Sequence, residues 1–100
     1  NTNPSKTSAN LSYEEQKRLR SERRKLEKEE ERLLNEIEKC ETEIAENEAL
    51  LAEPEVYSNG EKSRAVQKKI EELRARAEEL SESWAEAASK MEASALALLV

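Results

Sequence analysis

Residues 33–51 read LLNEIEKCETEIAENEALL, and residues 66–84 read VQKKIEELRARAEELSESW. In both stretches the seam residues recur alternately three and four positions apart, which is the heptad pattern of a coiled coil. The segment between them, AEPEVYSNGEKSRA, contains Pro54 and Gly60, and both residues disfavour a single unbroken helix. The sequence therefore predicts two long helices joined by a turn.

The two heptad stretches also match each other when one runs antiparallel to the other. Every seam position of the first stretch then has one partner on the second, in a single register. The pairs are Leu51–Val66, Asn47–Ile70, Ile44–Leu73, Cys40–Ala77, Ile37–Leu80 and Leu33–Trp84. We therefore predict an all-α fold, an antiparallel two-helix coiled-coil hairpin.

Two dimers compete with this hairpin. A parallel dimer of one long helix would have to continue through Pro54 and Gly60. A dimer that exchanges helices between chains keeps the same contacts and stays open as an alternative. We expect a monomer.

Local signals mark where each helix begins and ends. Ser12 is an N-cap candidate, and Glu15 completes a capping box with it. Pro54 ends the first helix, and Ser58 or Asn59 can cap the second. The expected organisation is a flexible linker over 1–10 and a coiled-coil domain over 11–100, with helices over about 13–52 and 61–98 and a tip over 53–60.

The predicted seam is uneven along its length. At the tip, we expect Val56 and Tyr57 to close its open end, and Asn47 in the seam to help fix the register at a cost in stability. Towards the termini the same register places Arg23 opposite Ser94, and alanine replaces the larger apolar residues of the second helix. This half should pack more loosely, or against a partner that this chain lacks.

Composition excludes several classes of function. Of the 100 residues, 40% are charged and 3% aromatic, and the net charge of −6 disfavours general affinity for nucleic acid or anionic membranes. There is no His, and the single Cys40 sits in the seam, where a small buried hydrophobe is expected. We therefore predict no metal site, no cofactor and no catalytic activity. With no predicted signal peptide or membrane span, a cytoplasmic location is expected.

The charge distribution is more informative than the total. Bases outnumber acids between Tyr13 and Lys28, whereas acids outnumber bases from Glu29 to Glu55. Within the basic segment, Lys17, Arg20, Arg24 and Lys28 share one helical face. Such a stripe can follow a phosphate backbone, although charged runs on coiled coils are commonly solvated faces.

Two short motifs resemble a known family. The opening LSYEEQK (residues 11–17) and the tip LAEPEVYS (residues 51–58) are similar to parts of the C-terminal coiled-coil domain of ABC-F proteins, the non-transporting ATP-binding-cassette ATPases, and above all of the Uup-like branch. Trp84 is similar to a seam tryptophan of that family. The apolar residues 95–100 and the basic richness of the first helix depart from its pattern.

The resemblance implies a parent ATPase with two upstream cassettes that works in the cytosol on ribosomes or branched DNA. It implies nucleic-acid binding, to DNA or ribosomal RNA, by the bases that follow the opening motif. The candidate binding residues are Lys17, Arg18, Arg20, Arg23, Arg24, Lys25 and Lys28. Weaker candidates on the second helix are Lys62, Arg64, Lys68, Lys69, Arg74 and Arg76.

Other functions fit the same architecture. The chain could be a structural spacer or an arm that docks on the parent's own ATPase cassettes, without affinity for nucleic acid. A tRNA-contacting coiled-coil arm, of the kind carried by aminoacyl-tRNA synthetases, also shares the hairpin. The opening and tip motifs fit the ABC-F domain better.

Overall fold

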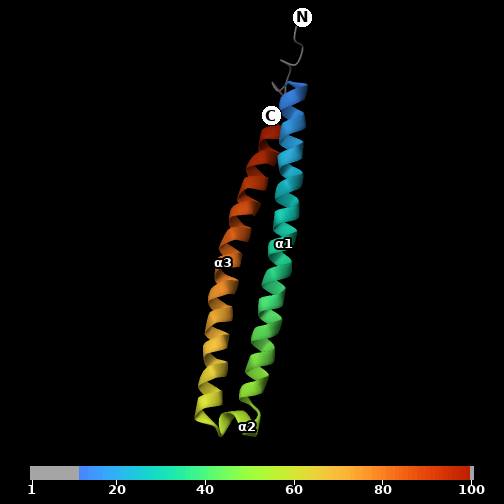
Figure 1. Ribbon diagram of the computed structural model, residues 1–100. Helices are drawn as coiled ribbons and strands as arrows, with labels where there is room; N and C mark the ends of the chain where they lie inside the picture. Colours follow the sequence, from blue (N-terminus) through green and yellow to red (C-terminus); the bar gives the residue numbers. More distant parts are fainter. Residues whose placement is uncertain (1–11, 100) are drawn as a thin grey trace, which may run out of the picture. The chain divides into compact units, whose positions relative to one another are not determined.

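The structure, a computed structural model, describes the backbone of residues 12–99 and the side chains of residues 12–97. This part of the chain forms α1 (Tyr13–Leu51), α2 (Pro54–Tyr57) and α3 (Gly60–Leu99) (Figure 1). The two long helices are rich in Glu, Lys, Arg, Leu and Ala, which favour helix. The linker expected over residues 1–10 lies outside the described part.

Helices α1 and α3 run in opposite directions and pack against each other, so the predicted all-α antiparallel hairpin is confirmed. The chain divides into two compact units. We call residues 33–83 the tip unit, and residues 12–32 together with 84–99 the terminal unit. Each unit contains a segment of α1 and a segment of α3.

Side-chain caps define where the long helices start. At α1, the Ser12 amide donates to Glu15 Oε1 at 3.0 Å, and the Glu15 amide donates to Ser12 Oγ at 3.1 Å. These two bonds form the predicted capping box. At α3, Asn59 Oδ1 accepts hydrogen bonds of 3.1 Å from the amides of Glu61 and Lys62. Asn59, rather than Ser58, is thus the N-cap of α3.

The tip contains a helical turn that the sequence pattern did not indicate. Pro54 occupies the start of α2, where its missing N–H leaves no helical bond unmade. Consecutive residues of a helix point about 100° apart, so only one of two neighbours can face the seam. Val56 is buried, as expected, but Tyr57 is 62% exposed, and the expectation that it also closes the seam is wrong.

The core of the tip unit follows the predicted heptads. Its buried side chains are Leu33, Cys40, Val56, Ile70, Leu73 and Leu80. All of them except Val56 occupy predicted seam positions. Asn47 is half-buried, and its Nδ2 donates to the Glu43 carbonyl of its own helix at 2.8 Å. The amide is therefore satisfied without a bond to α3.

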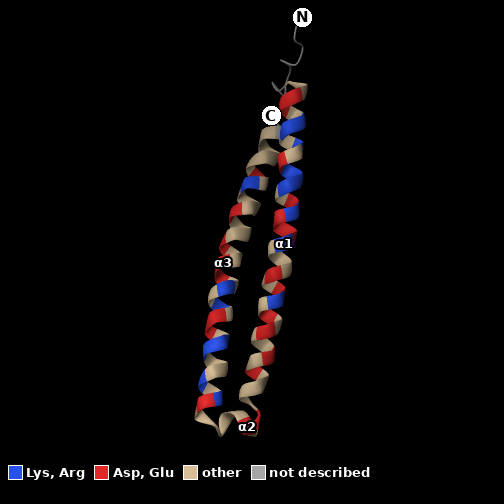
Figure 2. Cartoon of the chain, in the orientation of Figure 1, with Lys and Arg blue, Asp and Glu red and all other residues tan. Residues whose placement is uncertain are grey.

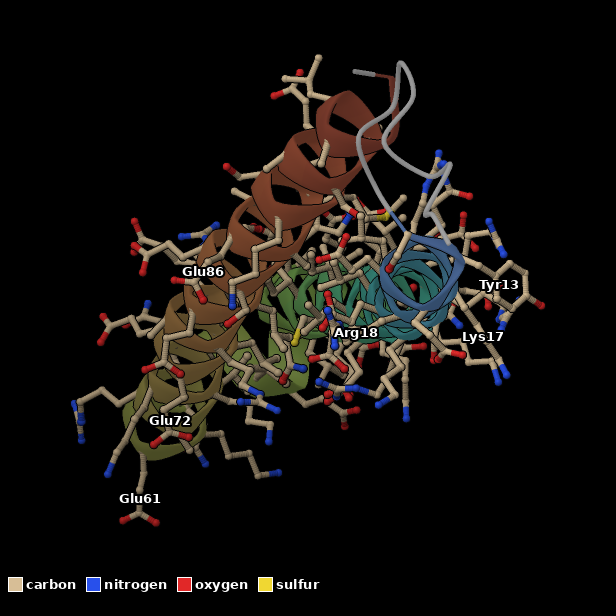
Figure 3. All side chains as sticks on the ribbon, turned by 90° about the horizontal axis from the view of Figure 1, so that it is seen from above. Tyr13, Lys17, Arg18, Glu61, Glu72 and Glu86 are labelled. Carbon is tan, nitrogen blue, oxygen red and sulfur yellow. The ribbon has the colours of Figure 1, made fainter. Side chains whose placement is uncertain are left out.

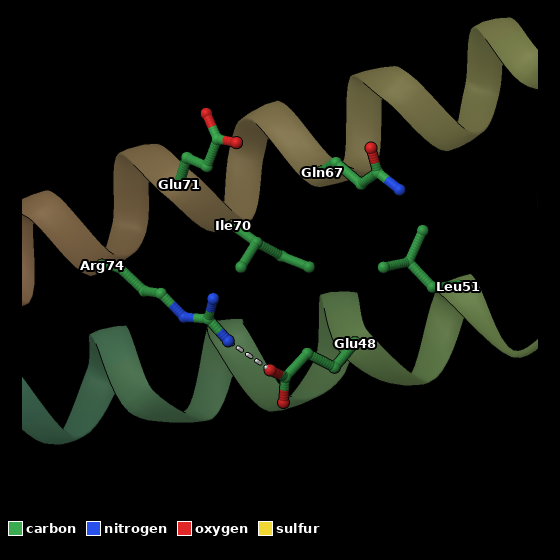
Figure 4. A pocket seen from close by; sticks show the side chains of 6 residues that line it. All are labelled: Glu48, Leu51, Gln67, Ile70, Glu71 and Arg74. Carbon is green, nitrogen blue, oxygen red and sulfur yellow. Dashed lines mark hydrogen bonds and ion pairs between the residues drawn. The ribbon is translucent and has the colours of Figure 1, made fainter.

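Ion pairs join the two helices of the tip unit on both flanks of this seam. Arg74 bonds Glu48 at 2.7 Å beside the hollow that Leu51 and Ile70 line (Figure 4). Arg76 bonds Glu36 at 3.2 Å. Three of the four side chains are at least half exposed and Glu36 is 33% exposed, so each pair contributes no more than about 1 kcal/mol. Their geometry nevertheless requires the predicted antiparallel register.

The seam of the terminal unit is thinner. Ala87 is its buried apolar residue among the described side chains, while Leu26, Trp84 and Met91 are half-buried. Three side-chain atoms of this unit are buried without a hydrogen-bond partner, namely Arg23 Nε, Trp84 Nε1 and Ser94 Oγ. Buried polar atoms normally find partners, so the terminal unit is less completely satisfied than the tip unit.

Candidate nucleic-acid interface

The seven bases predicted to bind nucleic acid all lie on the α1 segment of the terminal unit. Figure 2 shows them as a concentration of blue near the start of α1. Six of them are exposed and Arg23 is half-buried. The hairpin therefore holds six of these cations at the surface of one straight helical segment, and separates the seventh from them.

The exposed bases fall on two sides of α1. Lys17, Arg20, Arg24 and Lys28 succeed one another at spacings of three or four residues and share a face, which we call the outer stripe. Arg18 and Lys25 follow Lys17 and Arg24 by one residue and so lie about 100° further round the helix. Figure 3 shows Lys17 and Arg18 pointing to different sides of α1, with Tyr13 on the side of Lys17.

The cations of the outer stripe have no ion-pair partner among the described residues. Glu27 and Glu31 lie within one turn of Arg24 and Lys28, but neither bonds them. Unpaired, solvated cations on one helical face can neutralise successive phosphates and release their counterions. The outer stripe therefore has the electrostatic properties of a phosphate-binding surface.

Arg23 differs from the other candidates. It occupies a seam position of α1, three residues before Leu26, and its Nε atom is buried without a partner. The Nε end of the guanidinium is therefore shielded from solvent, unlike the exposed bases. The structure thus places Arg23 in the packing of the terminal unit and not in the outer stripe.

The weaker candidates on α3 belong to the tip unit, where acids of α1 lie across the seam. Arg74 and Arg76 are engaged by Glu48 and Glu36. Lys62, Arg64, Lys68 and Lys69 are exposed. The tip unit therefore pairs part of its positive charge internally, unlike the outer stripe.

Sequence reasoning overlooked one further base of the terminal unit, Lys90 on α3. Lys90 lines the same hollow as Lys25 and Leu26. The antiparallel register, extended towards the termini, sets Leu26 opposite Met91 and would have placed Lys90 beside it. Lys90 could thus have been found from the pairing of the two helices, but not from the composition of α3 alone.

One carboxyl group near the basic segment has a shifted pKa. Arg32 donates to both carboxylate oxygens of Glu29, through Nε at 3.2 Å and through a terminal nitrogen at 2.7 Å. This hydrogen bonding holds the pKa of Glu29 below its ordinary value of 4.5, and the positive charge of Arg32 acts in the same direction. Glu29 is therefore a charged neighbour of the basic segment at neutral pH.

Within residues 12–99, no group of three or more potential metal ligands comes together. No helix in the same range is long and apolar enough to cross a bilayer.

Comparison with known proteins identifies a family for this chain. The model of a family described as ABC transporter C-terminal domain matches residues 10–89, which includes both predicted heptad stretches and the tip. No curated protein and no solved structure matches the chain.

Proposed function

This chain belongs to the ABC transporter C-terminal domain family, and we propose that it is a non-catalytic arm that binds nucleic acid by its phosphate backbone. It is an accessory domain of an ABC protein. The outer stripe, formed by Lys17, Arg20, Arg24 and Lys28, is the proposed contact surface.

The observation that carries the proposal is the absence of ion-pair partners for these cations among the described residues. Charged side chains of a coiled coil that serve only structure tend to pair across the seam, as Arg74 and Arg76 do in the tip unit. In the outer stripe, the positive charge is left available to a ligand. A row of Lys and Arg on a helix contacts phosphates and carries no base-specific readout.

The parent protein and the target are parts of the same proposal. The opening motif and the proline–tyrosine tip support a place among the ABC-F proteins, and hence an arm that works beside two ATPase cassettes in the cytoplasm. DNA and ribosomal RNA are the two candidate targets. The arm positions the parent on nucleic acid, while the chemistry belongs to the cassettes.

The test is a binding titration of the chain against a linear DNA duplex, a branched DNA and an RNA hairpin at several salt concentrations. We expect affinities of roughly 1–100 μM near physiological salt, as for other non-specific contacts. If each cation of the outer stripe neutralises one phosphate, log K should fall with log salt with a slope of about −3 to −4. The ranking of the three ligands separates a role on DNA from a role on the ribosome.

Two charge-reversal variants locate the contact. The variant R20E/R24E removes the centre of the outer stripe and should abolish binding. The variant K62E/K68E changes the net charge by the same amount, but on exposed residues of the tip unit, and should bind almost as well as the parent sequence. Undiminished binding by R20E/R24E would show that the outer stripe is not the contact surface.

A further inference from the structure

Besides the hollow of Figure 4, two hollows lie at equivalent heptad positions of α1, one in each unit. The hollow of the terminal unit has a volume of about 390 Å³ and lies between Glu22, Lys25 and Leu26 of α1 and Lys90 and Ser94 of α3. The hollow of the tip unit has a volume of about 310 Å³ and is lined by Glu36, Lys39, Cys40, Glu43, Lys69, Leu73 and Arg76. Glu36, Lys39 and Cys40 follow Glu22, Lys25 and Leu26 at the same heptad positions. The pair can therefore be compared residue by residue.

The two hollows differ in whether charge bridges their rims. In the tip unit, Arg76 of α3 bonds Glu36 of α1 at 3.2 Å. The equivalent residues of the terminal unit are Lys90 and Glu22, and among the described residues no ion pair joins them. Lys25 and Lys90, on opposite rims of this hollow, have no anionic partner in the part of the chain that the structure describes.

The inner surface of the terminal hollow is also incomplete. Ser94 lines it, and the Ser94 hydroxyl is buried without a hydrogen-bond partner. In the tip hollow, α3 contributes Leu73, which has no polar atom to satisfy. The buried Arg23 Nε lies in the same seam and also lacks an acceptor. The free cations on the two rims favour a ligand that carries acceptor oxygens.

We propose that the hollow between Lys25 and Lys90 is a docking groove for an acidic amphipathic helix of a protein partner. An apolar side chain of that helix would contact Leu26, and carboxylates on either side would bond Lys25 and Lys90. A third helix laid along two packed helices is the usual way in which an amphipathic helix buries its apolar face. The inference does not depend on nucleic-acid binding by the outer stripe.

The chemistry of the groove favours a protein helix over nucleic acid. Glu22 lies on the same rim and would repel a continuous phosphate backbone, whereas a peptide can place a neutral or basic residue beside it. Leu26 offers an apolar contact that phosphates do not use. The outer stripe is on another side of α1, so the two surfaces can be disabled separately.

The test uses the whole chain and a fluorescent synthetic peptide with leucines on one helical face and glutamates on both sides of it. A matched peptide has lysine in place of every glutamate. We expect the acidic peptide to bind in a salt-dependent manner and the basic peptide not to bind. Reversal of both rim charges, K25E/K90E, should weaken binding about tenfold or more, because two cation–carboxylate contacts are lost.

Two variants make the result specific. K39E/K69E reverses two lysines that line the tip hollow, of which Lys39 is the equivalent of Lys25, and it should leave peptide affinity unchanged, as should R20E/R24E in the outer stripe. Amide chemical shifts perturbed by the peptide should cluster around Lys25, Lys90 and Ser94. Absence of peptide binding, equal binding of both peptides, or equal loss in K39E/K69E would overturn the proposal. So would concentration-dependent dimerisation that K25E/K90E abolishes, because the occupant would then be a second copy of the chain.

Discussion

The tip unit and the terminal unit follow one heptad pattern, yet their helices are held together differently. In the tip unit, Leu, Ile and Val fill the seam, and ion pairs such as Arg74–Glu48 join α1 to α3. In the terminal unit, alanine and serine face a sparse row of apolar residues, and Arg32–Glu29 is an ion pair within α1 alone. The tip unit therefore contains both the apolar seam and the ion pairs between helices that specify the antiparallel register.

The difference between the two units indicates which of them can bind a charged ligand. A charge that bonds a neighbouring helix is used for folding, and a charge without a partner is available to a ligand. The tip unit has acids on α1 opposite bases on α3, so much of its charge is internal. The terminal unit has its bases on α1 with few acids opposite, and its buried donors are unsatisfied. The terminal unit therefore packs more weakly and carries more free charge, because its α3 segment places small residues and few acids opposite the bases of α1.

The largest expected effect comes from removing a seam residue of the tip unit. Leu73→Ala should lower the free energy of unfolding by about 2–4 kcal/mol, because a buried leucine leaves a cavity that two helices fill poorly. Urea unfolding followed by circular dichroism measures the change. Leu34→Ala makes the same substitution at a residue that is 45% exposed, and should change stability by no more than about 0.5 kcal/mol. Equal losses in the two variants would show that Leu73 is not a seam residue.

The second prediction converts part of the terminal unit into a seam like that of the tip unit. Arg23→Leu removes a guanidinium with a buried, unpartnered Nε and adds an apolar side chain, so stability should rise by about 1 kcal/mol. Affinity for DNA should hardly change, because Arg23 is not in the outer stripe. Urea unfolding and a duplex titration measure the two effects.

Arg24→Leu is the matched control, since it removes the same charge from the neighbouring position. It should leave stability within about 0.5 kcal/mol and weaken DNA binding. If Arg23→Leu weakens binding as much as Arg24→Leu, Arg23 reaches the ligand and the division between seam and outer stripe is wrong.

Much of the fold followed from the sequence, because heptad spacing and antiparallel pairing are properties of residue order. The seam of the tip unit, the capping box at Ser12 and the burial of Cys40 were all predictable in this way. The exposure of Tyr57 was not, since it depends on a short helix at the tip whose bonds are local to residues 53–59.

The site was less predictable than the fold, because a count of bases does not show which of them have partners across the seam. Counting bases grouped Arg23 with Arg24, although the heptad itself puts Arg23 in the seam. The loose packing of the terminal unit was expected from the register that sets Arg23 opposite Ser94, whereas the hollow that Lys25 and Lys90 line was recognised only in the structure. Composition identifies charge, whereas partners across the seam decide whether that charge is free.

The smallest expected effect concerns the ion pair that does not cross the seam. Because the folded-state pKa of Glu29 is lowered, the pair contributes stability above the unfolded-state pKa, and this contribution disappears as the pH falls through the lower folded-state value. Carbon-detected NMR titration should show the Glu29 pKa rising in Arg32→Gln, and less in Arg32→Lys, which keeps the charge. An unchanged Glu29 pKa in Arg32→Gln would contradict the assigned cause. Glu29→Gln should leave amide exchange in α3 unaltered, whereas Glu48→Gln, which breaks a bond between the helices, should speed exchange near Arg74.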